Sequence, residues 1–121
     1  MEKIDILKIA SLNDSDREKT MQELFKTMLS MSDAEKTAVL KELVKEMAEK
    51  ASDSQYLNLC ITNLKLASSL DDETLKAFLK LRMSVSSSLP KDLAERDMKF
   101  IKEGLGKADE NTRAKISKFL Q

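Results

Sequence analysis

Signals that start helices recur about every nineteen residues along almost the whole chain, and they limit the folds open to it. In each unit a small or apolar residue is followed by a helix-starting cluster with acidic side chains, and the units open at Leu12, Met31, Ala51, Leu70, Leu89 and Ala108. Side-chain oxygens in such clusters accept hydrogen bonds from backbone N–H groups that lack partners in the first turn of a helix. The pattern therefore predicts an array of helices of similar length.

The clearest start signals follow Met31 and Ala51. Ser32 with Glu35, and Ser52 with Gln55, have the residue types and spacing of a capping box. Residues 13–16, 71–74 and 109–112 carry looser versions, and Pro90 suits a first helical position, where no N–H is needed. Gly104 and Gly106 are suited to a left-handed helix terminus, so we expect the helix before them to end there.

After each start, apolar residues recur with the three- and four-residue spacing of one helix face. The most regular sets are Met21, Leu24, Phe25, Met28 and Leu29, and then Leu40, Leu43, Val44, Met47 and Ala48. Helices of about 15 residues joined by loops of about four must turn back on one another, so we expect successive helices to be antiparallel neighbours. We predict an all-α fold of antiparallel helical hairpins, with six to seven helices in a single domain over residues 1–121.

Two units together make a helical hairpin of about 38 residues, a period that resembles the armadillo and HEAT class of helical repeats. The most similar stretch runs from Met98 to Leu120. There Asp109, Arg113, Ala114 and Leu120 stand in an order similar to the Asp, Arg and Leu pattern of the second helix of a HEAT repeat. The resemblance implies a right-handed α–α superhelix, and a compact orthogonal bundle is the alternative.

The charge balance and the apolar runs exclude some classes of protein. The 21 basic and 21 acidic side chains give a formal net charge of zero, which argues against strong nucleic-acid binding through counterion release. No run approaches the roughly 18 apolar residues that span a bilayer, and residues 1–5 lack the regions of a secretory signal. A single cysteine forms no internal disulfide. We expect a soluble, cytoplasmic protein without a membrane segment.

The residue types needed for most catalytic sites are missing or have a simpler explanation. The chain has no histidine, which removes the commonest general base and the commonest metal ligand. Cys60 lies in an apolar stripe, where a thiol usually behaves as a small hydrophobic side chain. The acidic run at residues 71–73 could hold Mg²⁺, but helix capping is the favoured interpretation because similar acids begin nearly every unit. We predict no enzymatic activity, no cofactor and no metal site.

Two local features have both a structural and a functional interpretation. The seven methionines are interpreted mainly as core residues, with an adaptable docking groove as the alternative; the members on apolar stripes are Met21, Met28, Met47, Met83 and Met98. The serine-rich segment from Ser84 to Ser88 is interpreted as a helix end and a turn. Contact with a ligand, or modification, is the alternative for these serines.

Basic residues outnumber acidic ones in the C-terminal half, and this imbalance defines a candidate interaction surface. Its members are Lys76, Lys80, Arg82, Lys99, Lys102 and Arg113. The leading hypothesis is a non-catalytic protein–protein interaction or scaffold module, with a homodimer as one form of it if an edge helix stays uncovered. The alternative is a regulatory nucleic-acid-associated protein that uses the basic half, although a 4% aromatic content weakens any base-stacking model.

Overall fold

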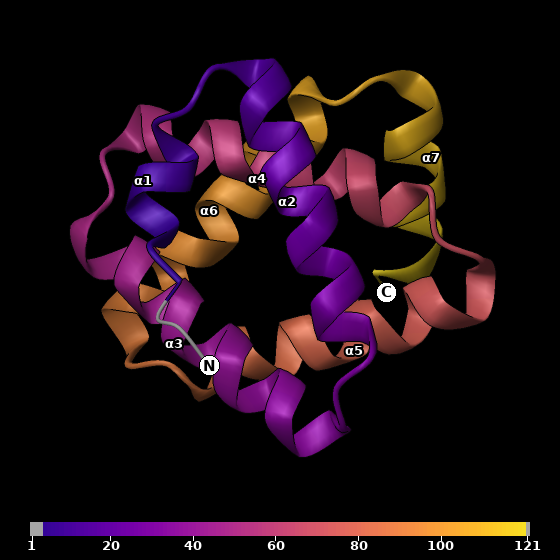
Figure 1. Cartoon of the computed structure of the whole chain (residues 1–121), viewed down its shortest axis with the longest axis horizontal. Helices are drawn as coiled ribbons and strands as arrows, with labels where there is room; N and C mark the ends of the chain where they lie inside the picture. The colour runs from indigo at the N-terminus through magenta and orange to yellow at the C-terminus, as the bar shows by residue number, and fades with distance from the viewer. Residues whose placement is uncertain (1–3, 121) are drawn as a thin grey trace.

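The computed structural model describes residues 4–120, and this part of the chain contains seven helices and no strand. Antiparallel helices pack together in a compact arrangement (Figure 1). The all-α fold class is therefore confirmed. The helices are α1 (Ile6–Ala10), α2 (Asp14–Leu29), α3 (Asp33–Lys50), α4 (Asp53–Ser68), α5 (Asp72–Ser88), α6 (Lys91–Lys107) and α7 (Glu110–Phe119).

The six long helices begin at the predicted start signals. Ser32 and Ser52 complete capping boxes, and their hydroxyl groups accept hydrogen bonds from the Glu35 and Gln55 backbone N–H groups at 3.2 and 3.1 Å. Asn13 and Asp109 cap α2 and α7 in a similar way, whereas Asp71 precedes α5 without a side-chain capping bond. Pro90 lies one position earlier than predicted, because it is the N-cap of α6 and not its first helical residue.

The helix α6 ends at Lys107, close to its two glycines as expected, but the left-handed terminus predicted for these glycines is wrong. The helix continues through Gly104 and Gly106, neither of which has a positive φ, and Ala108 is its C-cap. Gly104 instead allows α6 to approach α4. A Cβ atom built on Gly104 would lie 3.2 Å from the Cys60 Cβ and 3.4 Å from the Leu64 Cδ1.

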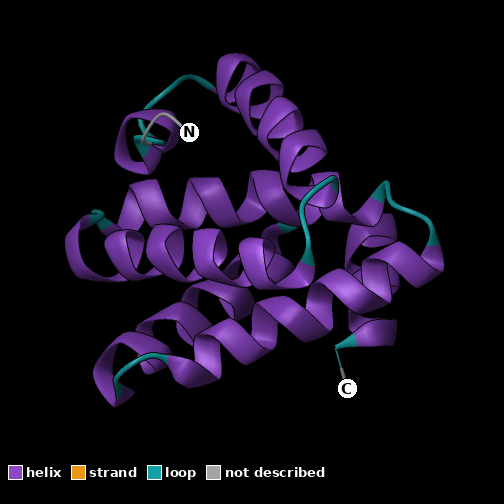
Figure 2. Cartoon of the chain, turned by 60° about the horizontal axis from the view of Figure 1, so that its bottom comes forward, coloured by secondary structure: helices purple, strands orange, loops and turns teal. Residues whose placement is uncertain are grey.

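The helices that contact each other most extensively are not successive ones. The largest contact joins α4 and α6, followed by α2 with α4 and α3 with α5, although α5 also contacts α6 and α6 contacts α7. The linkers explain this difference from the expected neighbours. Only residues 51–52 and 89–90 join α3 to α4 and α5 to α6, and the backbone at Ala51 and Leu89 is extended. The helices α1 to α6 therefore each pack mainly on a helix two places away along the chain, whereas α7 packs mainly on α4, and Figure 2 shows the resulting layers.

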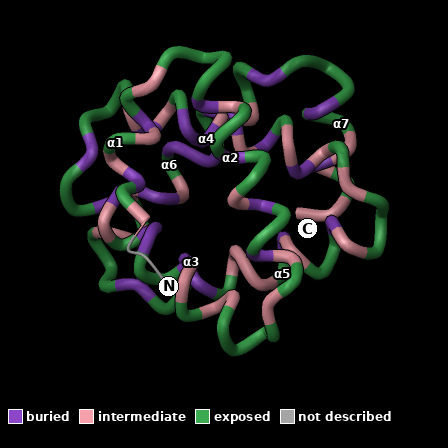
Figure 3. The backbone as a smooth tube through the Cα atoms, viewed as in Figure 1, coloured by how far each residue is buried: buried purple, intermediate pink, exposed green. Residues whose placement is uncertain are grey.

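The buried residues follow the apolar stripes expected from the sequence, and Figure 3 shows them on the inner sides of the helices. All five predicted stripe residues of α3 are buried, whereas Leu24 and Leu29 of α2 are only partly buried. Most of the core forms one cluster, and a smaller cluster is built around Met28, Val44 and Val85. Among residues 4–120, no helix has both the length and the apolar character needed to cross a lipid bilayer.

Two arginines at equivalent positions in their units fix the turns that precede α2 and α7. Arg17 donates from Nη1 to the carbonyl oxygen of Leu12 at 2.7 Å, and Arg113 donates from Nη2 to that of Ala108 at 2.8 Å. Arg17 also donates from Nε to the Thr62 hydroxyl on α4 at 2.9 Å, which joins α2 to α4. These hydrogen bonds satisfy carbonyl groups in the loops, as a folded chain requires.

Candidate functional site

A network of buried polar side chains joins α4, α5 and α6. Asp97 of α6 has no solvent exposure, and Arg82 of α5 donates two hydrogen bonds to its carboxylate at 2.7 and 2.8 Å. The Tyr56 hydroxyl of α4 donates a third, at 2.6 Å. A buried carboxylate needs this kind of compensation, because an unpaired charge in the interior is costly. The network therefore fixes the three helices relative to one another.

None of the three side chains in this network titrates near neutral pH. Burial alone would raise the pKa of Asp97, but the hydrogen bonds and the positive charge of Arg82 outweigh burial and hold this pKa below its usual value. Burial, and then the charge of Asp97, raise the pKa of Tyr56 well above its ordinary value. Burial would lower the pKa of Arg82, but Asp97 reverses this effect. At neutral pH the network therefore contains one carboxylate, one guanidinium and one neutral phenol.

Arg96 connects the same network to the end of α3. Its guanidinium donates to the carbonyl oxygens of Ala48 and Ala51 at 2.8 and 2.6 Å, and it lies 5.2 Å from the centre of the Tyr56 ring. The Tyr56 ring stacks on Phe100 with 4.8 Å between the ring centres. Arg96 thus satisfies carbonyl groups at a helix C-terminus and forms a cation–π contact at the same time.

Sequence reasoning missed most of this network. Arg82 was assigned to an exposed basic surface, whereas its side chain is only 17% exposed and faces inward. The partners Asp97 and Tyr56 lie far from Arg82 along the chain, so spacing alone gave no indication of the pair. One usable signal existed, because Asp97 is four residues from both Leu93 and Ile101 and so falls on the apolar stripe of α6.

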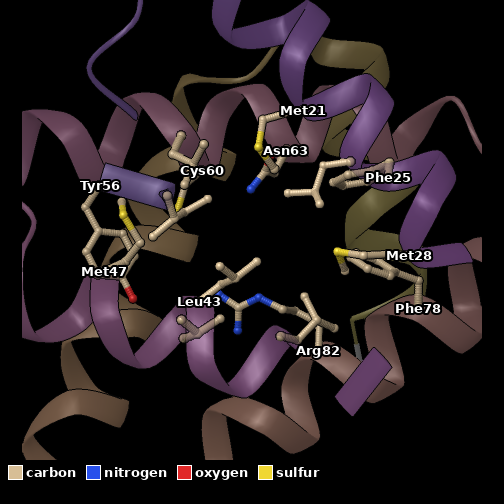
Figure 4. Close-up of a pocket in the computed structure, with 15 residues that line it drawn as sticks. Met21, Phe25, Met28, Leu43, Met47, Tyr56, Cys60, Asn63, Phe78 and Arg82 are labelled. Atoms are coloured by element: carbon tan, nitrogen blue, oxygen red, sulfur yellow. The ribbon is translucent and has the colours of Figure 1, made fainter. Parts of the chain in front are cut away.

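A mostly apolar cavity of about 80 Å³ is enclosed by α1, α2, α3, α4 and α5, and we call it the central cavity (Figure 4). Three flexible methionine side chains contribute to its walls, together with aromatic and aliphatic residues. The lining residues are Ile6, Met21, Leu24, Phe25, Met28, Leu40, Leu43, Val44, Met47, Tyr56, Leu59, Cys60, Asn63, Phe78 and Arg82.

A second cavity of about 60 Å³ adjoins the central cavity on the side of α6, and we call it the side cavity. The two cavities share Cys60, Asn63, Phe78 and Arg82 as lining residues. Cys60 is buried, as its place on an apolar stripe predicted, and burial is the largest cause that raises the pKa of its thiol to about 12. The thiol is therefore protonated at neutral pH.

A much larger and more open hollow, about 920 Å³, lies between α5 and the corner where α2 leads into α3. We call it the α5 cleft. Apolar side chains lie along it among charged side chains of both signs. The lining residues are Leu29, Asp33, Lys36, Leu70, Asp71, Glu73, Thr74, Ala77, Phe78, Lys80, Leu81 and Ser84.

The residues of the predicted basic surface have different environments. Exposed positions on α5 and α6 are occupied by Lys76, Lys80, Lys99 and Lys102. Lys80 lines the α5 cleft, whereas the Lys99 ammonium lies 5.3 Å from the centre of the Phe100 ring. Arg113 is exposed but holds the turn before α7 through its bond to Ala108. The structure therefore does not bring the six predicted residues together in one site.

The serines near the end of α5 are part of that helix, which continues through Ser88. The hydroxyl groups of Ser87 and Ser88 donate to backbone carbonyl oxygens of the same helix at 3.1 and 2.7 Å. Ser84 lines the α5 cleft, and Ser86 is buried. The expected helix end thus falls at Ser88, and the turn begins one residue later.

The acidic run at the start of α5 is spread over different contacts. Asp71 occupies the N-cap position, Asp72 lies 4.0 Å from the Lys115 ammonium, and Glu73 lines the α5 cleft. Within residues 4–120, no three acidic or cysteine side chains come together in a way that could hold a metal ion.

The chain was compared with protein-family models, with curated proteins and with solved structures, and none of them matches it. The geometry of the cavities and of the cleft is accordingly the basis for the functional argument.

Proposed function

We propose that this protein is a non-catalytic protein-interaction module that binds an amphipathic helix of a partner protein in the α5 cleft. The observation that carries the proposal is the cleft itself, a hollow of about 920 Å³ that combines apolar residues with charges of both signs. An apolar groove with a polar rim is the usual receptor for an amphipathic helix.

The shape of the cleft matches a helical partner. One wall is a stripe of α5 that includes Glu73, Ala77, Lys80 and Ser84, which share one face because they are three or four residues apart. At 1.5 Å per residue this stripe is about 16 Å long, or about three helical turns. The corner between α2 and α3 forms the opposite wall. A partner helix lying along α5 would place anchor residues at positions i, i+3 or i+4, and i+7.

The charges along the cleft favour one orientation of the partner. Asp71 and Glu73 lie at the start of α5, and Lys80 follows about two turns later. On the opposite wall Lys36 is 3.6 Å from Asp33, so the two charges are already paired. A partner helix with a basic residue near Glu73 and an acidic residue near Lys80 fits this pattern. Charge complementarity of this kind mainly adds specificity and speeds association.

The regular placement of helix starts supports an interaction role. The N-caps Asn13, Ser32, Ser52, Asp71 and Pro90 follow one another at intervals of about nineteen residues, a period that fits the helical-repeat class proposed from the sequence. The matching roles of the two arginines that hold the turns before α2 and α7 add to this argument. Proteins of the HEAT and armadillo class commonly use extended helical surfaces to bind partners.

The decisive test uses one exposed residue on the α5 wall of the cleft. Ala77→Glu places a charge where the apolar anchor of a partner would lie, without disturbing a buried side chain. Ala114→Glu is the matched control, because Ala114 is exposed on α7 and lies outside the cleft. Tagged wild-type protein and both variants would be used to capture partners from lysate with and without nuclease treatment, at low and high salt. Cross-linking followed by mass spectrometry would then locate the contact.

We expect Ala77→Glu to reduce capture of the partner at least tenfold and Ala114→Glu to leave it unchanged. Cross-links should involve Lys36 or Lys80, the two lysines of the cleft. Equal capture by both variants would disprove the assignment to the cleft. Capture that disappears with nuclease and salt would favour nucleic-acid binding through Lys76, Lys99 and Lys102, because phosphate contacts are strongly salt-dependent. Capture of a second copy of this chain would show that the partner is the same protein and that the complex is a homodimer.

A further inference from the structure

We propose that the central cavity and the side cavity together bind a small neutral molecule that has an apolar body and one hydroxyl group, as a phenol does. This site lies in the interior, and it does not depend on the partner proposed for the α5 cleft. The inference depends on three features of the cavities, namely their size, two incompletely used polar side chains and the absence of a net charge on the buried ion pair.

The size of the cavities suits a molecule of about one ring. Their volumes are about 80 and 60 Å³, and they adjoin across Asn63, Phe78 and Arg82. A cavity of about 150 Å³ lined by apolar side chains can hold benzene. Met28 and Met47 line the central cavity, and their unbranched side chains can shift to fit a guest.

Two polar side chains reach this space with hydrogen-bonding capacity left over. The Asn63 Oδ1 atom is buried and has no hydrogen-bond partner in the described part of the chain. The two bonds from Arg82 to Asp97 use only Nη1 and Nη2, so they leave the Nε–H group and one hydrogen on each Nη outside the pair. Figure 4 shows the Asn63 amide and the Arg82 guanidinium entering the same cavity from opposite sides. A buried polar atom without a partner is costly, so a guest that satisfies it gains affinity.

The chemistry of the guest follows from these groups. Asp97 already compensates the charge of Arg82, so an anionic guest would bring an uncompensated charge into the interior. A hydrocarbon would leave Asn63 unpaired. A hydroxyl group is neutral, donates one hydrogen bond and accepts others, and so it can donate to Asn63 and accept from Arg82.

The methionines provide the readout for a test on the full-length protein. Met21, Met28 and Met47 line the central cavity and Met83 lines the side cavity, whereas Met98 lines neither. With ¹³C-labelled methionine methyl groups, NMR titrations would compare phenol, toluene and benzoate. We expect phenol to shift the four lining methionines in a saturable manner and to leave Met98 unchanged. The dissociation constant for phenol should be at least tenfold lower than those for toluene and benzoate.

A pair of matched variants tests the role of the asparagine. Asn63→Leu removes the amide from the cavities, and Asn58→Leu makes the same change at an exposed position of α4. Asn63→Leu should bind phenol no better than toluene, whereas Asn58→Leu should retain the preference of the wild-type protein. If Asn63→Leu does not fold, the comparison of the three probes on the wild-type protein still decides the question.

Three results would overturn the proposal. The first is the absence of saturable methionine shifts up to the solubility limit of phenol, since the cavities would then hold only solvent. The second is equal affinity for phenol and toluene in the wild-type protein, because the polar groups would then have no role. The third is an equal shift at Met98, which would indicate non-specific partition of phenol into the core.

Discussion

The contact between α4 and α6 and the region of the central cavity and the α5 cleft show opposite ways of packing helices. Where α4 meets α6, Gly104 brings the backbones close together, and each oxygen of the Asp97 carboxylate accepts hydrogen bonds. The central cavity lies between α1, α2, α3, α4 and α5, and one of its lining residues is Asn63 of α4 with its unpaired oxygen. The large α5 cleft opens between α5 and the corner of α2 and α3. The first region therefore holds the fold together, whereas the second leaves a surface cleft and interior space unfilled.

The largest effect should come from breaking the buried ion pair. Arg82→Met leaves the Asp97 carboxylate buried without its cation, so we expect a loss of about 3–5 kcal/mol in the free energy of unfolding. Chemical denaturation at pH 7 measures this loss. The double variant with Asp97→Asn should recover part of the stability, because it also removes the uncompensated charge. A loss below about 1 kcal/mol would show that the network is not a main support of the α4–α6 region.

The pH dependence of the stability of Arg82→Met tests whether its loss of stability is electrostatic. In the wild-type protein the pKa of Asp97 is lowered, so its contribution to stability is present above the pKa of an unfolded Asp, about 4, and is lost as the pH falls through the lowered value. Without Arg82, burial should raise this pKa, and protonation should relieve the penalty in acid. The stability difference between wild type and Arg82→Met should therefore shrink from pH 7 to pH 4. A stability difference that stays the same from pH 7 to pH 4 would contradict an electrostatic origin of the loss.

Two leucines compare the dense and the loose parts of the core. Leu75 has no solvent exposure and lines none of the hollows described, whereas Leu43 is 8% exposed and lines the central cavity. Each change to Ala should cost about 2–5 kcal/mol, with Leu75→Ala near the upper end because more contacts are lost there. Thermal and urea unfolding measure both values. An equal or larger loss for Leu43→Ala would remove the contrast, and a loss under about 0.5 kcal/mol would place Leu43 outside the core.

The two glycines of α6 give a matched pair for the α4–α6 contact. Gly106→Ala meets no atom within 4 Å, so better helix propensity should stabilise the protein by up to about 1 kcal/mol. Gly104→Ala would press against the Cys60 Cβ, which cannot move without the backbone, and should leave the protein about 1–3 kcal/mol less stable than Gly106→Ala. Urea unfolding of both variants measures the difference. Equal stabilities of Gly104→Ala and Gly106→Ala would show that α4 can shift to make room for the added methyl group.

The smallest effect on stability is expected for substitution of the buried Cys60. Cys60→Ala removes one sulfur atom from the wall of the cavities and should cost about 1 kcal/mol. Capture of a partner through the α5 cleft should be unchanged, because Cys60 does not line that cleft. The pull-down described for Ala77→Glu measures this. Loss of capture by a folded Cys60→Ala protein would give the thiol a direct role in binding.

The starts of the long helices and the buried helix faces can be predicted from local sequence patterns. Ser32 and Ser52 cap helices as predicted because a capping bond spans only three residues, and the stripe from Leu40 to Ala48 is buried because its period is set within one helix. Such signals act within one or two turns and can therefore be read without knowing the rest of the fold.

The pairing of the helices and the positions of the hollows cannot be predicted from such local patterns. Asp97 contacts Arg82 and Tyr56 because α6 packs on α5 and α4, and nothing in the local sequence specifies that contact. The sequence favours a left-handed helix terminus at Gly104, yet this glycine serves a close approach to α4 that depends on a residue far away in the chain. The pairing of side chains and the close packing of helices depend on how the helices are placed relative to one another. That placement is determined jointly by the two- or three-residue linkers and by the packing of the whole core.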